Sequence, residues 1–285
     1  MGILAPAPLL FVYLQRGKTA GLILMGLVFA VLYVLMGPGQ AMLFAAEYVV
    51  MATLLAESIR AQLTMDKCIF IGALGSMVLG TFLMFVLFAE REASLTDFFQ
   101  GQIMKHFELS MEALKSMGEK QAELDSMQAF FDQSSRTLAS AYPAFIMVGS
   151  LITAAINFFL VRTLWIKLYG ETLFRQEKFS ELVLPDFLVW LLILSSGSLF
   201  LLGSPIGTVG INVLGVALLI YFFQGLAISV HILESKNVPV FLWILAFFLV
   251  LIQPLLIGLV IGLGVFDIWA DFRKIKHKQT EDLEQ

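Results

Sequence analysis

Long uncharged apolar stretches alternate with short charged segments along most of the chain. Four stretches contain no Asp, Glu, Lys or Arg: Thr19–Ala46, Thr137–Val161, Val209–Val230 and Val240–Phe266. A helix needs about 20 residues to cross a hydrocarbon layer about 30 Å thick, and a helix satisfies its backbone hydrogen bonds without water. The pattern therefore predicts an all-α fold, a polytopic transmembrane helical bundle.

We expect about eight apolar segments in this bundle. They are Met1–Gln15, Thr19–Met36, Ala41–Ala56, Cys68–Phe88, Tyr142–Val161, Phe187–Leu202, Val209–Val230 and Val240–Phe266. The first and the sixth are short for a span. The Gly37-Pro38-Gly39 sequence predicts a turn between the second and third segments, because proline lacks an amide donor and glycine is conformationally unconstrained. Pro254 predicts a kink within the last segment.

Residues 89–141 have a different character, with nine acidic and five basic side chains. Apolar residues still recur near the helical period: Ile103, Phe107, Met111, Leu114, Met117, Leu124, Met127 and Phe131. This pattern predicts an amphipathic helical hairpin outside the membrane, with its turn near Gly118 or Ser126. The chain thus divides into N-terminal membrane helices (1–88), an acidic amphipathic insertion (89–141), C-terminal membrane helices (142–272) and a polar tail (273–285).

Basic residues between the apolar segments predict the orientation, because Lys and Arg in short loops favour the cytoplasmic side. Placing Arg16 and Lys18 inside also places Lys67 and Lys167 inside, and the acidic insertion outside. Simple alternation would then put Arg273 and its basic neighbours outside, against the rule. One late segment is therefore expected not to be a simple span, and the short Phe187–Leu202 segment is the candidate.

Composition excludes several classes of function. Hydrophobic residues make up 59% of the chain and charged residues 14%, whereas soluble domains carry about 25% charged residues. No basic stripe interleaved with aromatic residues indicates nucleic-acid binding. Cys68 is the only cysteine, and the three histidines stand far apart in sequence. Because no catalytic or metal-ligand motif is present, we expect no enzyme activity, no cofactor and no bound metal.

Polar residues inside apolar segments are the candidate contacts for a substrate or ion. Glu47 is the clearest, because a carboxylate in hydrocarbon costs several kcal/mol unless it finds a partner. It could bind a proton, a cation or a polar substrate, or it could hydrogen-bond to a neighbouring helix near the interface. Asn157, Asn212 and Gln224 are uncharged, and for these interhelical hydrogen bonding is the simpler interpretation.

A second group of polar residues surrounds the end of the last apolar segment. Asp267 and Asp271 share a helix face, so a basic group should lie opposite them. Arg162 or Lys167, at the end of an earlier apolar segment, could supply it, whereas Arg273 could cap the helix or extend toward the interface beside Trp269. The group would form a structural clamp or a functional site.

Small residues spaced four apart predict close helix packing. On one helix these are Gly72, Ser76 and Gly80, and on another they are Gly258 and Gly262. The pattern predicts helix packing and gives little information about function.

Several short motifs together resemble a known family. They are Leu4-Ala5-Pro6-Ala7-Pro8 followed by Arg16-Gly17, Tyr142-Pro143-Ala144, Asn157 with Arg162, Leu184-Pro185 with Trp190, Gln224-Gly225-Leu226, and Asp267 through Arg273. With these motifs the chain resembles, over nearly its whole length, the YybS-like family of bacterial membrane proteins without settled function. The stretch from Asp267 to Arg273 is the most specific of them.

The YybS-like family is in turn similar to the membrane-embedded substrate-binding components of energy-coupling-factor vitamin transporters, and more distantly to the cell-shape protein MreD. The first similarity implies a substrate pocket that opens outward between helices, and the second implies a scaffold without transport. Relatives usually carry another apolar helix before the Ala-Pro-Ala-Pro stretch. Because this chain begins directly on that stretch, we do not expect an energising partner to dock through such a helix.

Two hypotheses follow for a protein of the bacterial cytoplasmic membrane. The first is a small-molecule binding or transport component that uses Glu47 within the bilayer. The alternative is a membrane scaffold or assembly protein that contacts a protein partner through residues 89–141. In both, the lipid bilayer is the main partner of the chain.

Overall fold

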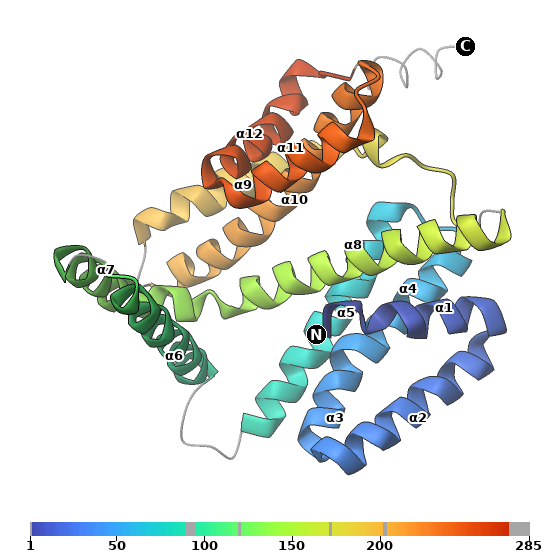
Figure 1. The fold of residues 1–285 in the computed structure, drawn as a ribbon, viewed down its shortest axis with the longest axis horizontal. Helices are drawn as coiled ribbons and strands as arrows, with labels where there is room; N and C mark the ends of the chain where they lie inside the picture. The colour runs from blue at the N-terminus through green and yellow to red at the C-terminus, as the bar shows by residue number, and fades with distance from the viewer. Residues whose placement is uncertain (1, 89–94, 119–120, 171–172, 202–203, 274–285) are drawn as a thin grey trace. The chain divides into compact units, whose positions relative to one another are not determined.

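The computed structural model describes residues 2–88, 95–118, 121–170, 173–201 and 204–273, and within these ranges every regular element is helical. The helices are α1 (Pro6–Arg16), α2 (Lys18–Met36), α3 (Pro38–Phe44), α4 (Val50–Arg60), α5 (Met65–Phe88), α6 (Leu95–Ser116), α7 (Gln121–Ser140), α8 (Tyr142–Tyr169), α9 (Leu188–Gly197), α10 (Pro205–Ser235), α11 (Val240–Ile252) and α12 (Pro254–Ala270) (Figure 1). Single turns add η1 (Gly2–Leu4), η2 (Ala45–Val49), η3 (Phe179–Glu181) and η4 (Ser198–Leu201). The predicted all-α polytopic bundle is confirmed.

The chain forms two compact units, which we describe separately. Unit 1 comprises Met1–Arg175 with Leu201–Thr208, and unit 2 comprises Gln176–Phe200 with Val209–Gln285. Helix α8 therefore packs in the same unit as the N-terminal helices, although the amphipathic insertion separates it from them in sequence. Its contacts with α5 and α1 explain this arrangement.

Five helical segments in the described part of the chain are long and apolar enough to span a bilayer. They are Lys18–Met36, Pro38–Arg60, Met65–Leu87, Tyr142–Tyr169 and Pro205–Ser235. Helices α11 and α12 pass the same test together, but they are bent by 107° at Gln253. With the short apolar helix α1 and the short segment Leu188–Leu201, these account for the eight apolar segments expected from sequence. The break at Pro254 was expected, but the angle is much larger than that of a kink.

Two glycines make the turns at the start of unit 1. Gly17 and Gly37 have φ angles of +90° and +89°, a region that favours glycine because it has no Cβ. Gly37 ends α2, and Pro38 then begins α3, where its missing amide hydrogen costs no helical bond. The predicted turn at Gly37-Pro38-Gly39 is confirmed.

Helix α5 lies close against α4 because two of its residues are glycines. A Cβ at Gly72 would lie 2.9 Å from Leu55, and one at Gly75 would lie 2.1 Å from Leu54. Gly80, further along α5, has no other group within 4 Å. The small-residue face predicted to pack closely therefore does so at Gly72, and the space beside it widens toward Gly80.

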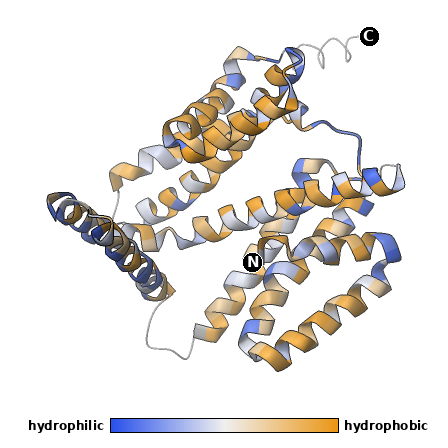
Figure 2. Ribbon diagram, in the orientation of Figure 1, coloured by the Kyte–Doolittle hydropathy of each residue, from blue (hydrophilic) through white to orange (hydrophobic). Residues whose placement is uncertain are grey.

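Helices α6 and α7 form the predicted hairpin and pack against each other (Figure 1). The rings of Phe107 and Phe131 stack with centroids 3.8 Å apart, and Met111 and Leu124 are buried beside them. Gly118 lies at the end of α6 with φ +84°, in one of the two predicted turn regions. Figure 2 shows the difference in composition: hydrophilic residues follow the length of α6 and α7, whereas helices such as α2 and α5 are hydrophobic almost throughout.

In unit 2, helices α10 and α12 approach until their backbones touch. A Cβ at Gly225 would lie 1.8 Å from the carbonyl oxygen of Val260, and one at Gly264 would lie 2.1 Å from the carbonyl oxygen of Tyr221. Gly258 and Gly262 have no other group within 4 Å. Close packing therefore occurs on α12, but at Gly264 and not at the two glycines picked out by the four-residue spacing.

This packing predicts opposite results for two glycines that are two residues apart on α12. We expect Gly264→Ala to destabilise the protein by about 1–3 kcal/mol, because the methyl group would force two helix backbones apart. Gly262→Ala is the matched control and should leave stability nearly unchanged, since its Cβ meets open space. Thermal unfolding in detergent measures both, and equal midpoints for the two variants would contradict the contact between α10 and α12.

Candidate functional site

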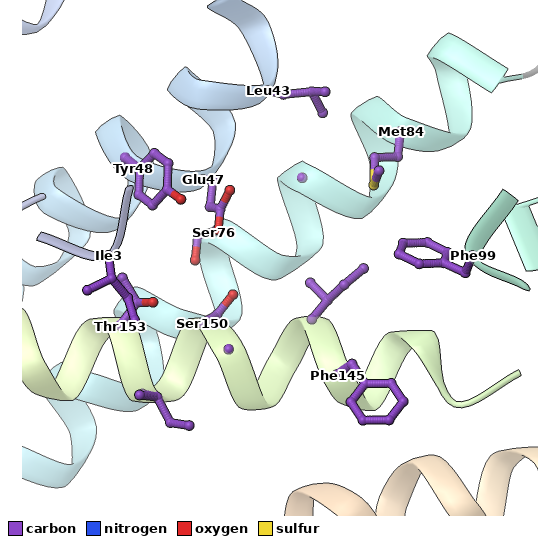
Figure 3. A pocket seen from close by; sticks show the side chains of 14 residues that line it. Ile3, Leu43, Glu47, Tyr48, Ser76, Met84, Phe99, Phe145, Ser150 and Thr153 are labelled. Atoms are coloured by element: carbon purple, nitrogen blue, oxygen red, sulfur yellow. The ribbon is translucent and has the colours of Figure 1, made fainter. Parts of the chain in front are cut away.

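A cavity of about 510 Å³ lies within unit 1, between η2, α5 and α8 (Figure 3). Ile3, near the N-terminus, and Phe99, on α6, complete its wall. Known ligand pockets span about 300–1,000 Å³, so this cavity is large enough for a small metabolite. It is the candidate functional site.

Glu47 extends into this cavity from an unusual part of the helix (Figure 3). Residues Ala45–Val49 form a π-helical turn, in which the amide of Val50 donates to the carbonyl of Ala45. Such a turn inserts an extra residue into a helix and occurs often at functional sites, because it changes the direction of side chains that a regular helix would fix. The π-turn provides the local structural reason for the position of Glu47.

Glu47 also lies near the middle of its span. At 1.5 Å per residue it is about 14 Å from Pro38 and about 20 Å from Arg60, the two ends of this helical segment. The carboxylate therefore sits at a depth where a charge is costly unless it has a partner. The hydroxyl of the adjacent Tyr48 is within hydrogen-bonding reach of it.

The other polar lining residues come from α5 and α8. Ser76 faces the cavity from α5, and its hydroxyl donates to the carbonyls of Gly72 and Ala73 at 3.0 Å each. Ser150 and Thr153, one helical turn apart on α8, add two further hydroxyls from the opposite wall. Figure 3 shows these oxygens gathered near Glu47, so the cavity has one polar end.

The remainder of the lining is apolar, with Met84 on α5, Phe145 on α8 and Phe99 on α6. Phe99 also stacks on Tyr142, the first residue of α8, with ring centroids 4.8 Å apart and planes at 5°. The amphipathic insertion thus contributes a side chain to the cavity wall. The spacing of apolar residues in the insertion gave no sign of this role.

Asn157 lies behind the cavity wall and is completely buried. Its amide donates to the carbonyls of Ile3 and Thr153, both at 2.7 Å. These two residues line the cavity, so Asn157 holds the N-terminal turn against α8. Its role here is the helix-to-backbone hydrogen bonding considered from sequence, and it supports the site without lining it.

A second contact fixes α1 beside α4 in the same unit. The hydroxyl of the buried Tyr13 donates to the carboxylate of Glu57, and the guanidinium of Arg60 lies 5.3 Å from the centre of the Tyr13 ring. Lys18 is 3.6 Å from Glu57, but both side chains are largely exposed, so this ion pair adds little stability. The hydrogen bond from the buried Tyr13 hydroxyl therefore contributes more than the ion pair to holding α1 against α4.

Unit 2 contains a different arrangement, a buried ion pair that is held by further hydrogen bonds. Arg273 lies 2.7 Å from Asp267, and the two side chains are only 1% and 5% exposed. Gln224 donates to the same carboxylate at 3.1 Å, and the amide of Phe272 donates to its other oxygen at 3.0 Å. Arg273 also donates to the carbonyls of Ser180 and Leu182 at 2.9 and 2.8 Å.

This network connects three parts of unit 2: α10, the end of α12 and the segment before α9. Gln224 extends it further, because its amide oxygen accepts from the backbone of Leu184 at 3.3 Å. The basic partner of Asp267 is therefore Arg273 from the same motif, where Arg162 or Lys167 was expected from sequence. Asp271 ends α12 with φ +39°, in the left-handed region.

The remaining candidates lie elsewhere in the two units. Arg162 is on α8 in unit 1, and Asn212 is on the first half of α10. Of the four proposed substrate contacts, the structure brings Glu47 to the cavity and Asn157 next to it. Gln224 belongs to the ion-pair network.

Sequence analysis did not identify Tyr48, Ser150, Thr153 or Phe99 as site residues. Ser76 was noted only as a small residue on a packing face. A signal for Ser150 and Thr153 was available, because two hydroxyl residues three apart share a face within an otherwise apolar span.

The sequence model of one protein family, described as "Predicted membrane protein (DUF2232)", matches residues 1–268. Comparisons with curated proteins and with solved structures find no match.

The buried ion pair predicts a large effect of removing one partner. Arg273→Ala should destabilise the protein by about 3–5 kcal/mol, because Asp267 would remain charged and uncompensated in an apolar environment. The double variant Asp267→Asn, Arg273→Gln should recover part of this loss, since no unpaired charge remains. Lys236→Ala, at the exposed residue just after α10, is the control, and thermal unfolding in detergent is the measurement. A single variant no less stable than the double one would contradict the role of the pair.

The same network predicts the sidedness of the C-terminal region. Because Arg273 binds the carbonyls of Ser180 and Leu182, Lys178 and Phe272 should lie on the same side of the membrane. In a Cys68→Ala background, Lys178→Cys and Phe272→Cys should react with an impermeant maleimide from the same side.

Gly39→Cys, at the start of the span Pro38–Arg60, and Lys67→Cys, beyond its other end, are the matched control pair and should react from opposite sides. Labelling of Lys178→Cys and Phe272→Cys from different sides would contradict the network in unit 2.

Proposed function

The chain belongs to this family of membrane proteins, and we propose that it is a small-molecule binding or transport component whose site is the cavity around Glu47. The single observation that carries the proposal is a carboxylate that extends into a cavity at mid-span. Binding of a ligand would offset the cost of that charge in the membrane.

Three features of the cavity support a ligand site over a packing defect. Its volume of about 510 Å³ lies within the range of known ligand pockets. Its hydroxyls and carboxylate gather at one end and its apolar side chains at the other, as in sites that orient a ligand. Its wall includes a π-helical turn, a feature enriched at functional sites.

The chain resembles the YybS-like family, and the similarity of that family to the substrate-binding components of energy-coupling-factor transporters agrees with this proposal. In such components a substrate site lies between membrane helices. On the same basis we assign the protein to the bacterial cytoplasmic membrane and expect no enzymatic reaction.

The alternative, a scaffold similar to MreD, depends on the hairpin of α6 and α7. Much of the apolar stripe predicted on this hairpin is used internally, since Phe107 stacks on Phe131 and Met111 and Leu124 are buried. Phe130 and Met117 remain exposed, at 70% and 79%. A crosslinker at Phe130 is therefore a sharper test of a protein partner than one at Phe107. Because Phe99 connects the hairpin to the cavity wall, we favour the binding role.

The proposal predicts ligand-dependent stabilisation that requires Glu47. In a panel of vitamins and metabolites, at least one compound should raise the thermal midpoint of the purified protein, because a ligand at 100 times its Kd adds about 2.7 kcal/mol to the folded state. Glu47→Gln should abolish or strongly reduce the shift.

Glu234→Gln, a charge removal at the exposed end of α10, is the control and should respond like the wild type. No shift with any compound, or an equal shift in Glu47→Gln, would count against the cavity as the site.

A further inference from the structure

The geometry points to an organic cation with an apolar body as the ligand of the Glu47 cavity, an inference that rests on the proposed function. The cationic group would lie against Glu47, and the apolar body would extend toward Met84, Phe99 and Phe145. This assignment follows from the sign of the charge, the kind of polar groups and the shape of the cavity.

The charge in the cavity is negative. Within the described residues no Lys, Arg or His lines the cavity, whereas Glu47 does. In unit 2 the buried carboxylate of Asp267 has an arginine at 2.7 Å. A carboxylate in a membrane span requires a positive partner or a proton, and in unit 1 the space for that partner is the cavity itself.

Ser76 also favours a ligand that donates a hydrogen bond. It uses its hydroxyl hydrogen on the carbonyls of Gly72 and Ala73, so it offers the cavity its oxygen lone pairs. Proteins bind anions with Arg or Lys side chains or with the free amides at helix N-termini. Glu47, Ser76 and Thr153 all lie inside helices, where the amides are already bonded. An anionic ligand would meet the like charge of Glu47 and the lone pairs of Ser76.

The size and the lining of the cavity favour an organic cation over a metal ion as the ligand. Hard cations take 6–8 oxygen ligands, but the described lining contains one carboxylate, and no cluster of three or more metal-ligating side chains occurs among the described residues. A volume of about 510 Å³ far exceeds a dehydrated ion. Aromatic rings such as Phe99 and Phe145 suit an organic cation, because the face of a ring attracts positive charge.

The test uses probes that share a shape but differ in charge. Benzyltrimethylammonium carries a permanent positive charge, and 2,2-dimethylpropylbenzene is its uncharged carbon analogue. Phenylacetate represents an anion, and longer alkyl ammonium ions with their carbon analogues extend the series. Binding is measured to the purified protein in a nonionic detergent, with the same detergent alone as the blank.

We expect the wild type to bind the ammonium probes about tenfold more tightly than their carbon analogues. In Glu47→Gln this ratio should fall to within about threefold of unity, while Glu234→Gln should keep the wild-type ratio. A preference for the carbon analogue or for phenylacetate, or a ratio unchanged in Glu47→Gln, would overturn the assignment of a cation.

A second measurement does not depend on a variant. A hydrophobic carbodiimide modifies carboxyl groups in apolar surroundings, and mass spectrometry locates the product. Benzyltrimethylammonium should slow modification of Glu47 by about tenfold, and 2,2-dimethylpropylbenzene should not. Equal rates with and without the cation would overturn the contact with Glu47.

The outcomes distinguish an error in the cation assignment from an error in the proposed binding site. If the metabolite panel gives Glu47-dependent stabilisation but the cations show no preference, the cavity is a binding site for another class of ligand and the cation assignment is wrong. If neither the panel nor any probe binds, both fail. If only carbodiimide modification is seen, with no protection by any probe, Glu47 acts as a proton site.

Discussion

The structure depends on one constraint, that hydrocarbon cannot hydrogen-bond to a polar group. Every backbone amide within the membrane must bond inside the chain, and the spanning segments in the described part of the chain are accordingly helices. The same constraint acts on side chains. Each charged or strongly polar group in an apolar span needs a partner nearby, so the position of such groups is informative.

The two units meet this requirement in different ways. In unit 2 the chain supplies the partners itself, because Arg273, Gln224 and the amide of Phe272 surround Asp267. Its Gly225 and Gly264 bring α10 and α12 together closely enough for that network to form. In unit 1 the carboxylate of Glu47 faces a cavity bounded by hydroxyls and aromatic rings. A closed network stabilises a fold, whereas a charge at a cavity can recognise something that enters it.

The cavity results from a balance between close and loose packing along α5. Gly72 and Gly75 hold this helix against α4, and the π-turn at Ala45–Val49 shifts the register of the residues just beyond the contact. Ser76 and Gly80 then leave space that larger side chains would fill. Asn157 holds Ile3 in the wall by donating a hydrogen bond to its carbonyl. Phe99 completes the wall from the amphipathic hairpin. The position of the site thus depends on elements far apart in the chain.

The sequence predicts the fold class, the eight apolar segments, the turn at Gly37 and an amphipathic hairpin that turns near Gly118 or Ser126, because these follow from hydropathy and from local backbone chemistry. The structure has the hairpin turn at Gly118. The sequence also indicates Glu47 and the motif from Asp267 to Arg273, since charge is rare in apolar spans. Tertiary packing is what makes Arg273 the partner of Asp267, packs α8 with the N-terminal helices, and brings Phe99, Ser150 and Thr153 to the cavity that Glu47 lines. Helix periodicity shows which residues share a face, but which faces meet depends on the packing of small residues and on long-range hydrogen bonds, and neither has a periodic signal.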